Sequence, residues 1–208
     1  GNPSNPKIIR KEYQDYDSYG NIGLQINYGN LDVTGDEVFT YHEYWIPCAS
    51  GPYIADRIKH TYITASAGGH KLRESFFWYD DRESCPEKGN LTKEENWLDT
   101  GNNPITTYKY DPYGNRTQTI DPEGRVTTVE YDMSNTFPSK TTNALGWVTT
   151  KNYNLTNGEV EQEVDPNGYV THYEFDVFNR KISEIKSYDT TTFPTTVIQY
   201  VIDGTAPE

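Results

Sequence analysis

Acidic residues recur in the second half of the chain in a pattern that raises one chemical hypothesis, the hydrolysis of a glycosidic bond. Two carboxyl groups that face each other across a cleft can act as a general acid and as a base or nucleophile. The recurring acids are Asp111, Asp121, Asp132, Asp165 and Asp176. A catalytic pair is needed once, at one special place, whereas these acids return at a nearly constant interval. The repetition favours a structural role, and we expect no catalytic residue and no enzymatic activity.

The interval belongs to a turn signature, Asp/Asn-x-x-Gly/Asn. It begins at Asp111, Asp121, Asp132, Asn143, Asn154, Asp165 and Asp176, with one spacing of 10 residues followed by spacings of 11. In such a turn the acid or amide oxygen accepts hydrogen bonds from backbone amides, and a glycine adopts a positive φ without steric cost. The glycines at the last position are Gly114, Gly124, Gly146 and Gly168. We predict that all these turn residues are structural.

The segments between the turns are too short for helices and are typical of strands. A four-residue turn leaves about seven residues, or roughly 23 Å of extended chain. Segments 125–132, 147–154 and 169–176 superpose without a gap, which gives a full repeat of 22 residues with two strands. Residues 160–164 alternate as in a half-buried antiparallel strand with a solvated acidic face. The sequence therefore predicts an all-β array of antiparallel hairpins that forms a twisted or spiralling sheet.

Aromatic residues are the feature of the array that suggests ligand binding. Trp147 lies in one repeat and Tyr169 and Tyr173 lie in the next, and a ladder of their rings could stack against sugar rings. Packing against neighbouring hairpins accounts for them as well and is the interpretation that we favour.

Tyr-Asp pairs connect the array to a known family. They occur at Tyr16-Asp17, Tyr79-Asp80, Tyr110-Asp111 and Tyr131-Asp132, with Tyr153-Asn154 and Phe175-Asp176 as variants. From about Tyr108 to Ile185 the chain strongly resembles the YD repeats of RHS-type proteins. The resemblance implies a spiralling sheet that is part of a larger hollow shell. Bacterial toxins use such shells to enclose a payload, and animal cell-surface proteins use them as adhesion scaffolds.

The function implied by this resemblance is that of a non-catalytic scaffold segment in a large secreted or surface protein, bacterial and toxin-associated. The alternative is an extracellular adhesion module that binds carbohydrate or a protein partner through the aromatic face. The implied main partner is the remainder of the same polypeptide. No cofactor is expected. A cut array also leaves an edge strand exposed, so we expect that the fragment can self-associate through it.

Composition excludes two classes of partner. The formal net charge of −13 opposes binding to the phosphates of nucleic acid. No apolar stretch approaches the roughly 18 residues needed to cross a bilayer, so we expect no membrane insertion. Hydrophobic residues make up 34% of the chain and aromatic residues 14%, which predicts a sheet-based core that relies on tyrosine.

The chain divides softly near residue 104, within one continuous sheet. We expect a tag remnant or linker at residues 1–6, degenerate β-repeats with longer loops at 7–103, the regular array at 104–186, and an irregular final strand with a truncated tail at 187–208. The sole methionine, Met133, lies in mid-chain, and we expect the chain to be an excerpt of a longer protein.

Two cysteines lie in the less regular part of the chain. Cys48 and Cys85 have no third or fourth partner for a structural zinc site. A disulfide between them is one interpretation, and two unpaired thiols are the other, which we favour slightly. The sequence does not fix the distance that decides between them.

Overall fold

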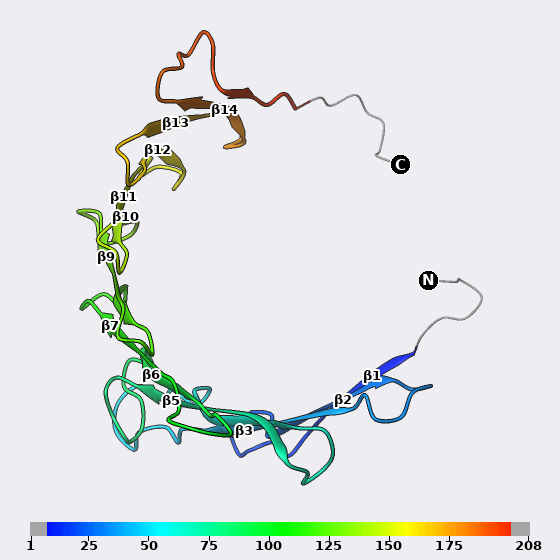
Figure 1. Ribbon diagram of the computed structural model, residues 1–208. Coiled ribbons are helices and arrows are strands. Elements are labelled where there is room, and N and C mark those ends of the chain that lie inside the picture. The colour runs from blue at the N-terminus through cyan, green and yellow to red at the C-terminus, as the bar shows by residue number, and fades with distance from the viewer. Residues whose placement is uncertain (1–7, 201–208) are drawn as a thin grey trace. The chain divides into compact units, whose positions relative to one another are not determined.

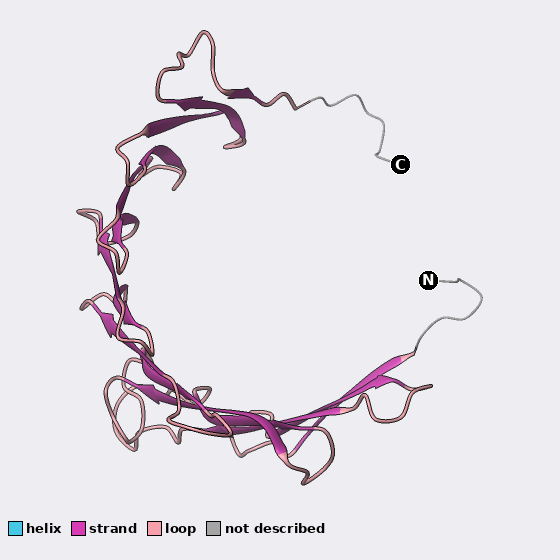
Figure 2. Ribbon diagram, viewed as in Figure 1, coloured by secondary structure: helices cyan, strands magenta, loops and turns pink. Residues whose placement is uncertain are grey.

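All regular secondary structure among the described residues of this chain is β-strand (Figures 1 and 2). The computed structural model describes residues 8–200. The expected tag or linker at residues 1–6 and the expected end of the tail lie outside the described residues. The predicted all-β fold is confirmed.

Fifteen strands follow one another along residues 8–200. They are β1 (Ile9–Gln14), β2 (Leu24–Asn30), β3 (Val38–Tyr44), β4 (Ile58–Thr64), β5 (Lys71–Tyr79), β6 (Leu91–Asn96), β7 (Ile105–Tyr110), β8 (Arg116–Ile120), β9 (Val126–Tyr131), β10 (Pro138–Thr142), β11 (Val148–Tyr153), β12 (Val160–Val164), β13 (Val170–Phe175), β14 (Lys181–Lys186) and β15 (Thr196–Val197). Their order in the sheet equals their order in the sequence. Every connection therefore joins strands that are neighbours in the sheet, as in an array of hairpins.

The described residues fall into two units by their contacts. Unit 1 runs to Gly114 and includes Thr119–Gly124. Unit 2 contains Asn115–Gln118 and the chain from Arg125 onward. The pairings between β1 and β7 belong to unit 1, and those between β9 and β15 belong to unit 2.

The strand register staggers the repeats of unit 2. Thr128 of β9 pairs with Thr142 of β10, and Thr142 pairs in turn with Val148 of β11. Thr128 is therefore level with Val148, although the residue one full repeat before Val148 is Val126. The same offset recurs across β11, β12 and β13. Equivalent positions are thus displaced by two residues, roughly 7 Å along the strand, for every repeat.

The hydrophobic core is thin. Among the described residues, the buried hydrophobic side chains are Leu24 and Ile26 of β2 and Ile185 of β14. The expected tyrosine-based core is wrong, since the tyrosines are half-buried or exposed. Within each unit the strands form one layer, so aromatic rings pack beside one another instead of inside. Tyr41 and Tyr62, for example, stack across β3 and β4 with ring centroids 4.6 Å apart.

A disulfide joins two long loops of unit 1. Loop 45–57 follows β3 and loop 80–90 follows β5, and their residues Cys48 and Cys85 are bonded, with Cα atoms 5.1 Å apart. The slight preference for unpaired thiols is therefore wrong. Strands β3 and β5 run in the same direction because only the antiparallel β4 lies between them, so their C-terminal ends lie on the same side of the sheet. This arrangement brings together two loops whose cysteines are 37 residues apart in sequence.

Candidate functional site

The turns of the array share one hydrogen-bonding scheme, which the turn at Asp165 illustrates. The Gly168 amide donates to the Asp165 carbonyl oxygen at 2.9 Å, and Gly168 has a φ of 84°. Oδ1 of Asp165 accepts from the amides of Asn167 and Tyr169 at 2.8 and 2.9 Å. Backbone donors therefore occupy this carboxylate, as the turn interpretation requires.

The other turns repeat the bond from the fourth residue's amide to the first residue's carbonyl. The first residues are Asp111, Asp121, Asp132, Asn143 and Asp176. The fourth residues, all with positive φ, are Gly114, Gly124, Asn135, Gly146 and Asn179. Each first residue also accepts a backbone amide through its side chain. The recurrent acids are thus placed along the turns and are not brought together as a facing pair.

The turn at Asn154 differs from the predicted signature. Its carbonyl oxygen accepts from the amide of Gly158, at 2.8 Å, and Gly158 has a φ of 79°. The turn is one residue longer than predicted, because a glycine adopts a positive φ more readily than the asparagine before it. That asparagine, Asn157, instead donates its side-chain amide to Oδ1 of Asn179 at 2.8 Å.

Hydrogen bonds lower the pKa of two turn carboxyl groups. The Ser134 hydroxyl, followed by the amides of Phe137 and Thr136, lowers the pKa of Asp132 from 3.8 to about 2. The Arg180 guanidinium is the main cause of a lowered pKa at Asp176, with which it forms an ion pair of 2.6 Å. A general acid at neutral pH needs the opposite shift.

The inserted loop 80–90 has a carboxylate that acts in the same way. Asp80 accepts backbone amides from Glu87, Lys88, Gly89 and Asn90 at 2.8 to 3.0 Å. Burial raises the pKa of Asp80, but these four donors outweigh it and leave the pKa lowered. The loop is therefore a Tyr-Asp turn that carries an insert, with the acid bonded to backbone amides across the insert.

The three predicted stacking residues have different surroundings. Trp147 and Tyr169 are 58% and 50% exposed. Tyr173 is half-buried, with the Lys181 ammonium 5.2 Å from its ring centroid. The Tyr169 ring contacts Tyr188, whose centroid is 6.2 Å away. Tyr188 gives no signal in the sequence, because it follows the point where the 11-residue spacing fails.

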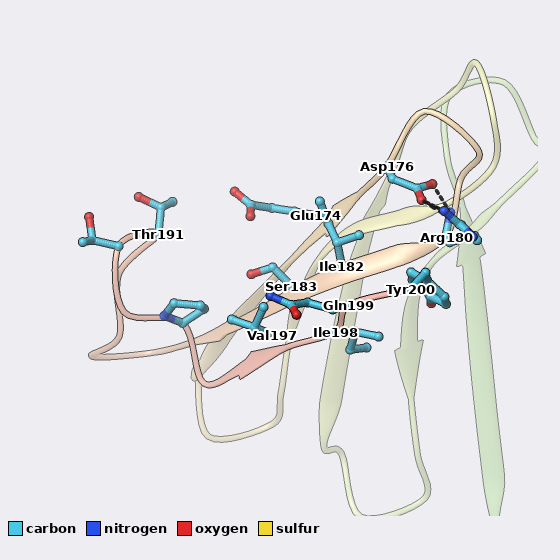
Figure 3. A pocket seen from close by; sticks show the side chains of 12 residues that line it. Glu174, Asp176, Arg180, Ile182, Ser183, Thr191, Val197, Ile198, Gln199 and Tyr200 are labelled. Carbon is cyan, nitrogen blue, oxygen red and sulfur yellow. Dashed lines mark hydrogen bonds and ion pairs between the residues drawn. The ribbon is translucent and has the colours of Figure 1, made fainter. Parts of the chain in front are cut away.

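A loop covers part of unit 2 and forms a cleft with the strands below. Loop 187–195 lies between β14 and β15. Together with β13 and β14 it lines a cavity of about 690 Å³ (Figure 3) and an adjoining one of about 550 Å³. Both cavities are lined by Glu174 and Thr191. Ser183 and Ile185 of β14, which also line them, are only 5% and 6% exposed. We refer to the two cavities together as the loop cleft.

The loop is held by its own hydrogen bonds. The Lys186 amide donates to Oγ1 of Thr195 at 2.9 Å, and the Thr195 hydroxyl donates to Asp189. The Ser187 hydroxyl accepts from the Val170 amide at 2.7 Å, which ties the start of the loop to β13. These bonds hold the loop in the conformation that forms the loop cleft. Its one sequence signal is Asp189, which comes two residues later than the repeat requires.

Two further findings concern what the described part of the chain lacks. Residues 8–200 contain no group of three or more His, Cys, Asp or Glu side chains placed to hold a metal ion. They also contain no helix with the length and apolarity to span a membrane.

Comparisons with known proteins relate part of the sequence to a family and most of the chain to a fold. Residues 87–126 match the family model of the RHS repeat. The structure of TcdB2–TccC3 matches with a TM-score of 0.61 and 12% identity, covering 85% of this chain and 13% of that one, and the same values hold for TcdB2–TccC3 without its hypervariable C-terminal region. The structure of TcdB2–TccC3–Cdc42 matches with a TM-score of 0.60 and 11% identity, over 82% of this chain and 13% of the other. No curated protein matches the sequence.

These structural matches concern the fold. At 11 to 12% identity they show a shared fold, and this chain spans 13% of the length of the proteins it matches. The resemblance to RHS-type proteins found from the Tyr-Asp pairs is confirmed.

Proposed function

We propose that this chain, which carries an RHS repeat at residues 87–126, is a non-catalytic scaffold segment in the wall of a larger shell of the toxin-enclosing type. The observation that carries the proposal is the sheet order, in which every strand pairs with its neighbours in sequence. Such a sheet can be extended by further repeats at its ends, because each repeat contacts only the next one. The thin core supports the same role, since a wall segment gains stability from adjoining repeats.

The location that we propose is extracellular, on or outside a bacterial cell. The Cys48–Cys85 disulfide supports this, because disulfides form and persist in oxidising compartments. The main partner is then the rest of the same polypeptide, and the wall encloses a payload.

The non-catalytic part of the proposal is tested with the turn acids themselves. Replacing Asp121 and Asp165 together by Asn keeps the side-chain acceptor but removes the acid-base capacity. We expect no polysaccharide hydrolysis by the parent chain and no functional change in the double variant. A reproducible hydrolytic activity that both substitutions abolish, by about 10²-fold or more, would contradict the proposal.

A second function, carbohydrate adhesion, is favoured by the exposure of Trp147 and Tyr169. Exposed rings of this kind can stack on the apolar faces of sugars. Glycan-array binding by the chain supports this function if the Trp147→Ala and Tyr169→Ala variants lose it. Binding that survives both substitutions would exclude these rings as the site.

A further inference from the structure

The loop cleft contains polar groups that a scaffold role does not use. Three of them are the side chains of Glu174 of β13, Ser183 of β14 and Thr191 of the loop, all of which line the larger cavity. Glu174 is directly opposite Ser183 in the strand register. In Figure 3 the Glu174 carboxylate and the Ser183 hydroxyl point to the same side, toward the loop that carries Thr191.

The charge of the cleft is negative, and one of its carboxylates has no side-chain partner. Asp176 is neutralised by Arg180 at 2.6 Å, and Asp189 accepts a hydrogen bond from Thr195. Glu161 accepts from the side-chain amide of Asn154 at 2.8 Å. The exposed carboxylate of Glu174, in contrast, has neither an ion pair nor a side-chain hydrogen bond within residues 8–200. The cleft therefore repels anions and attracts a positive group to Glu174.

Ser183 supplies an independent observation. Its Oγ is buried and has no hydrogen-bond partner in the described part of the chain. A buried hydroxyl without a partner costs free energy, so such groups are rare. Glu174 and Thr191 are exposed whereas Ser183 is only 5% exposed, so a ligand that enters the cleft meets Glu174 and Thr191 first.

We infer that the loop cleft binds a primary ammonium group, such as the side chain of a lysine on a peptide. An ammonium group has three donors and no acceptor. Glu174 supplies the counter-charge, and the hydroxyl oxygens of Thr191 and Ser183 supply two further acceptors. A neutral sugar would leave the Glu174 carboxylate without a counter-ion. This inference concerns ligand binding by the loop cleft and does not depend on the shell proposal.

The test is calorimetric titration of the chain with a capped Gly-Lys-Gly peptide and with the same peptide acetylated at Nζ. We expect binding of the first peptide and none of the second. Glu174→Gln should weaken binding by about tenfold or more, because hydrogen bonds to charged groups are the strong ones. The matched control is Glu184→Gln, which removes the same charge on the opposite face of β14, where Glu184 pairs with Lys181 and Lys186 at 3.5 and 3.3 Å.

A folding control and a second variant complete the test. Near-ultraviolet circular dichroism checks that each variant is folded, and Thr191→Val is a milder change that should weaken binding less than Glu174→Gln. The inference is overturned if the acetylated peptide binds equally well, if neither peptide binds, or if Glu184→Gln weakens binding as much as Glu174→Gln. Displacement of the lysine peptide by a neutral oligosaccharide at equal concentration would also overturn it.

Discussion

Asn157 donates its side-chain amide to Oδ1 of Asn179, at 2.8 Å and across one 22-residue repeat. Asn179 is also the last residue of its turn, with a φ of 60°. The hydrogen bond between these two side chains thus links two turns on the same side of the sheet. The backbone of Asn179 meanwhile holds a conformation that is unfavourable for most residues.

Two substitutions at Asn179 separate these contributions. Asn179→Ala loses the hydrogen bond and places a Cβ in the left-handed region without a compensating polar group, so we expect a loss of about 1–2 kcal/mol in the free energy of unfolding. Asn179→Gly loses the same bond without the strain and should cost less. Urea unfolding measures both. If both variants lose the same stability, the backbone of Asn179 is not strained. If neither variant loses stability, the hydrogen bond between Asn157 and Asn179 does not stabilise the chain.

Glycine substitutions test the turn assignments directly. Gly124→Val and Gly168→Val should each destabilise the chain by roughly 1–3 kcal/mol, because a β-branched residue is strained at positive φ. Gly20→Val should act similarly, since Gly20 has a φ of 86° and donates to the Asp17 carbonyl at 3.1 Å. A Cβ at these three positions would meet no atom within 4 Å, so strain alone is expected. Gly168→Asn is the control, and unchanged urea midpoints for the valine variants would refute the turns.

Removal of the disulfide should destabilise unit 1. A cross-link over 37 residues is expected to contribute about 3–4 kcal/mol, mainly by restricting the unfolded chain. The double variant Cys48→Ala/Cys85→Ala should unfold at lower urea concentration and become open to proteolysis in loops 45–57 and 80–90. Cleavage of these loops at the same rate in both proteins would show that the disulfide does not hold them.

The fold and the site differ in how far the sequence predicts them. The turn acids recur because each hairpin needs the same local acceptor, and a local requirement can be found by counting residues. The disulfide and the loop cleft depend on loops that meet only after the strands have paired. Cys48 and Cys85 are separated by two strands of sequence, and Glu174 meets Ser183 through a register that a bulge in the β13–β14 pairing alters. The longer turn at Asn154 was missed because both Asn157 and Gly158 fit a turn end.

Acid should reveal the hydrogen bonds of Asp132. Its pKa is lowered from 3.8 to about 2 in the folded chain, so its stabilising contribution is present above pH 3.8 and is lost as the pH falls toward 2. Asp132→Asn keeps the acceptor oxygen but does not titrate. We expect the variant to lose less stability than the parent between pH 4 and pH 2, measured by urea unfolding at each pH. If the parent and the variant lose stability equally between pH 4 and pH 2, the Asp132 carboxylate makes no such contribution.

The terminal strands should promote self-association. Strands β1 and β15 stand at the two ends of the strand order, and Ile9 of β1 is 68% exposed. An edge strand with free backbone groups can pair with another chain. Light scattering should show concentration-dependent association, and Ile9→Lys should reduce it. A chain that stays monomeric at high concentration would show that both edges are covered.

Electron cryomicroscopy of the complete protein that contains this chain tests the scaffold proposal most directly. The proposal predicts that residues 8–200 form consecutive strands of a shell wall, with further repeats paired beyond β1 and β15. A structure in which these residues form a separate domain, with no strand pairing to flanking repeats, would contradict it.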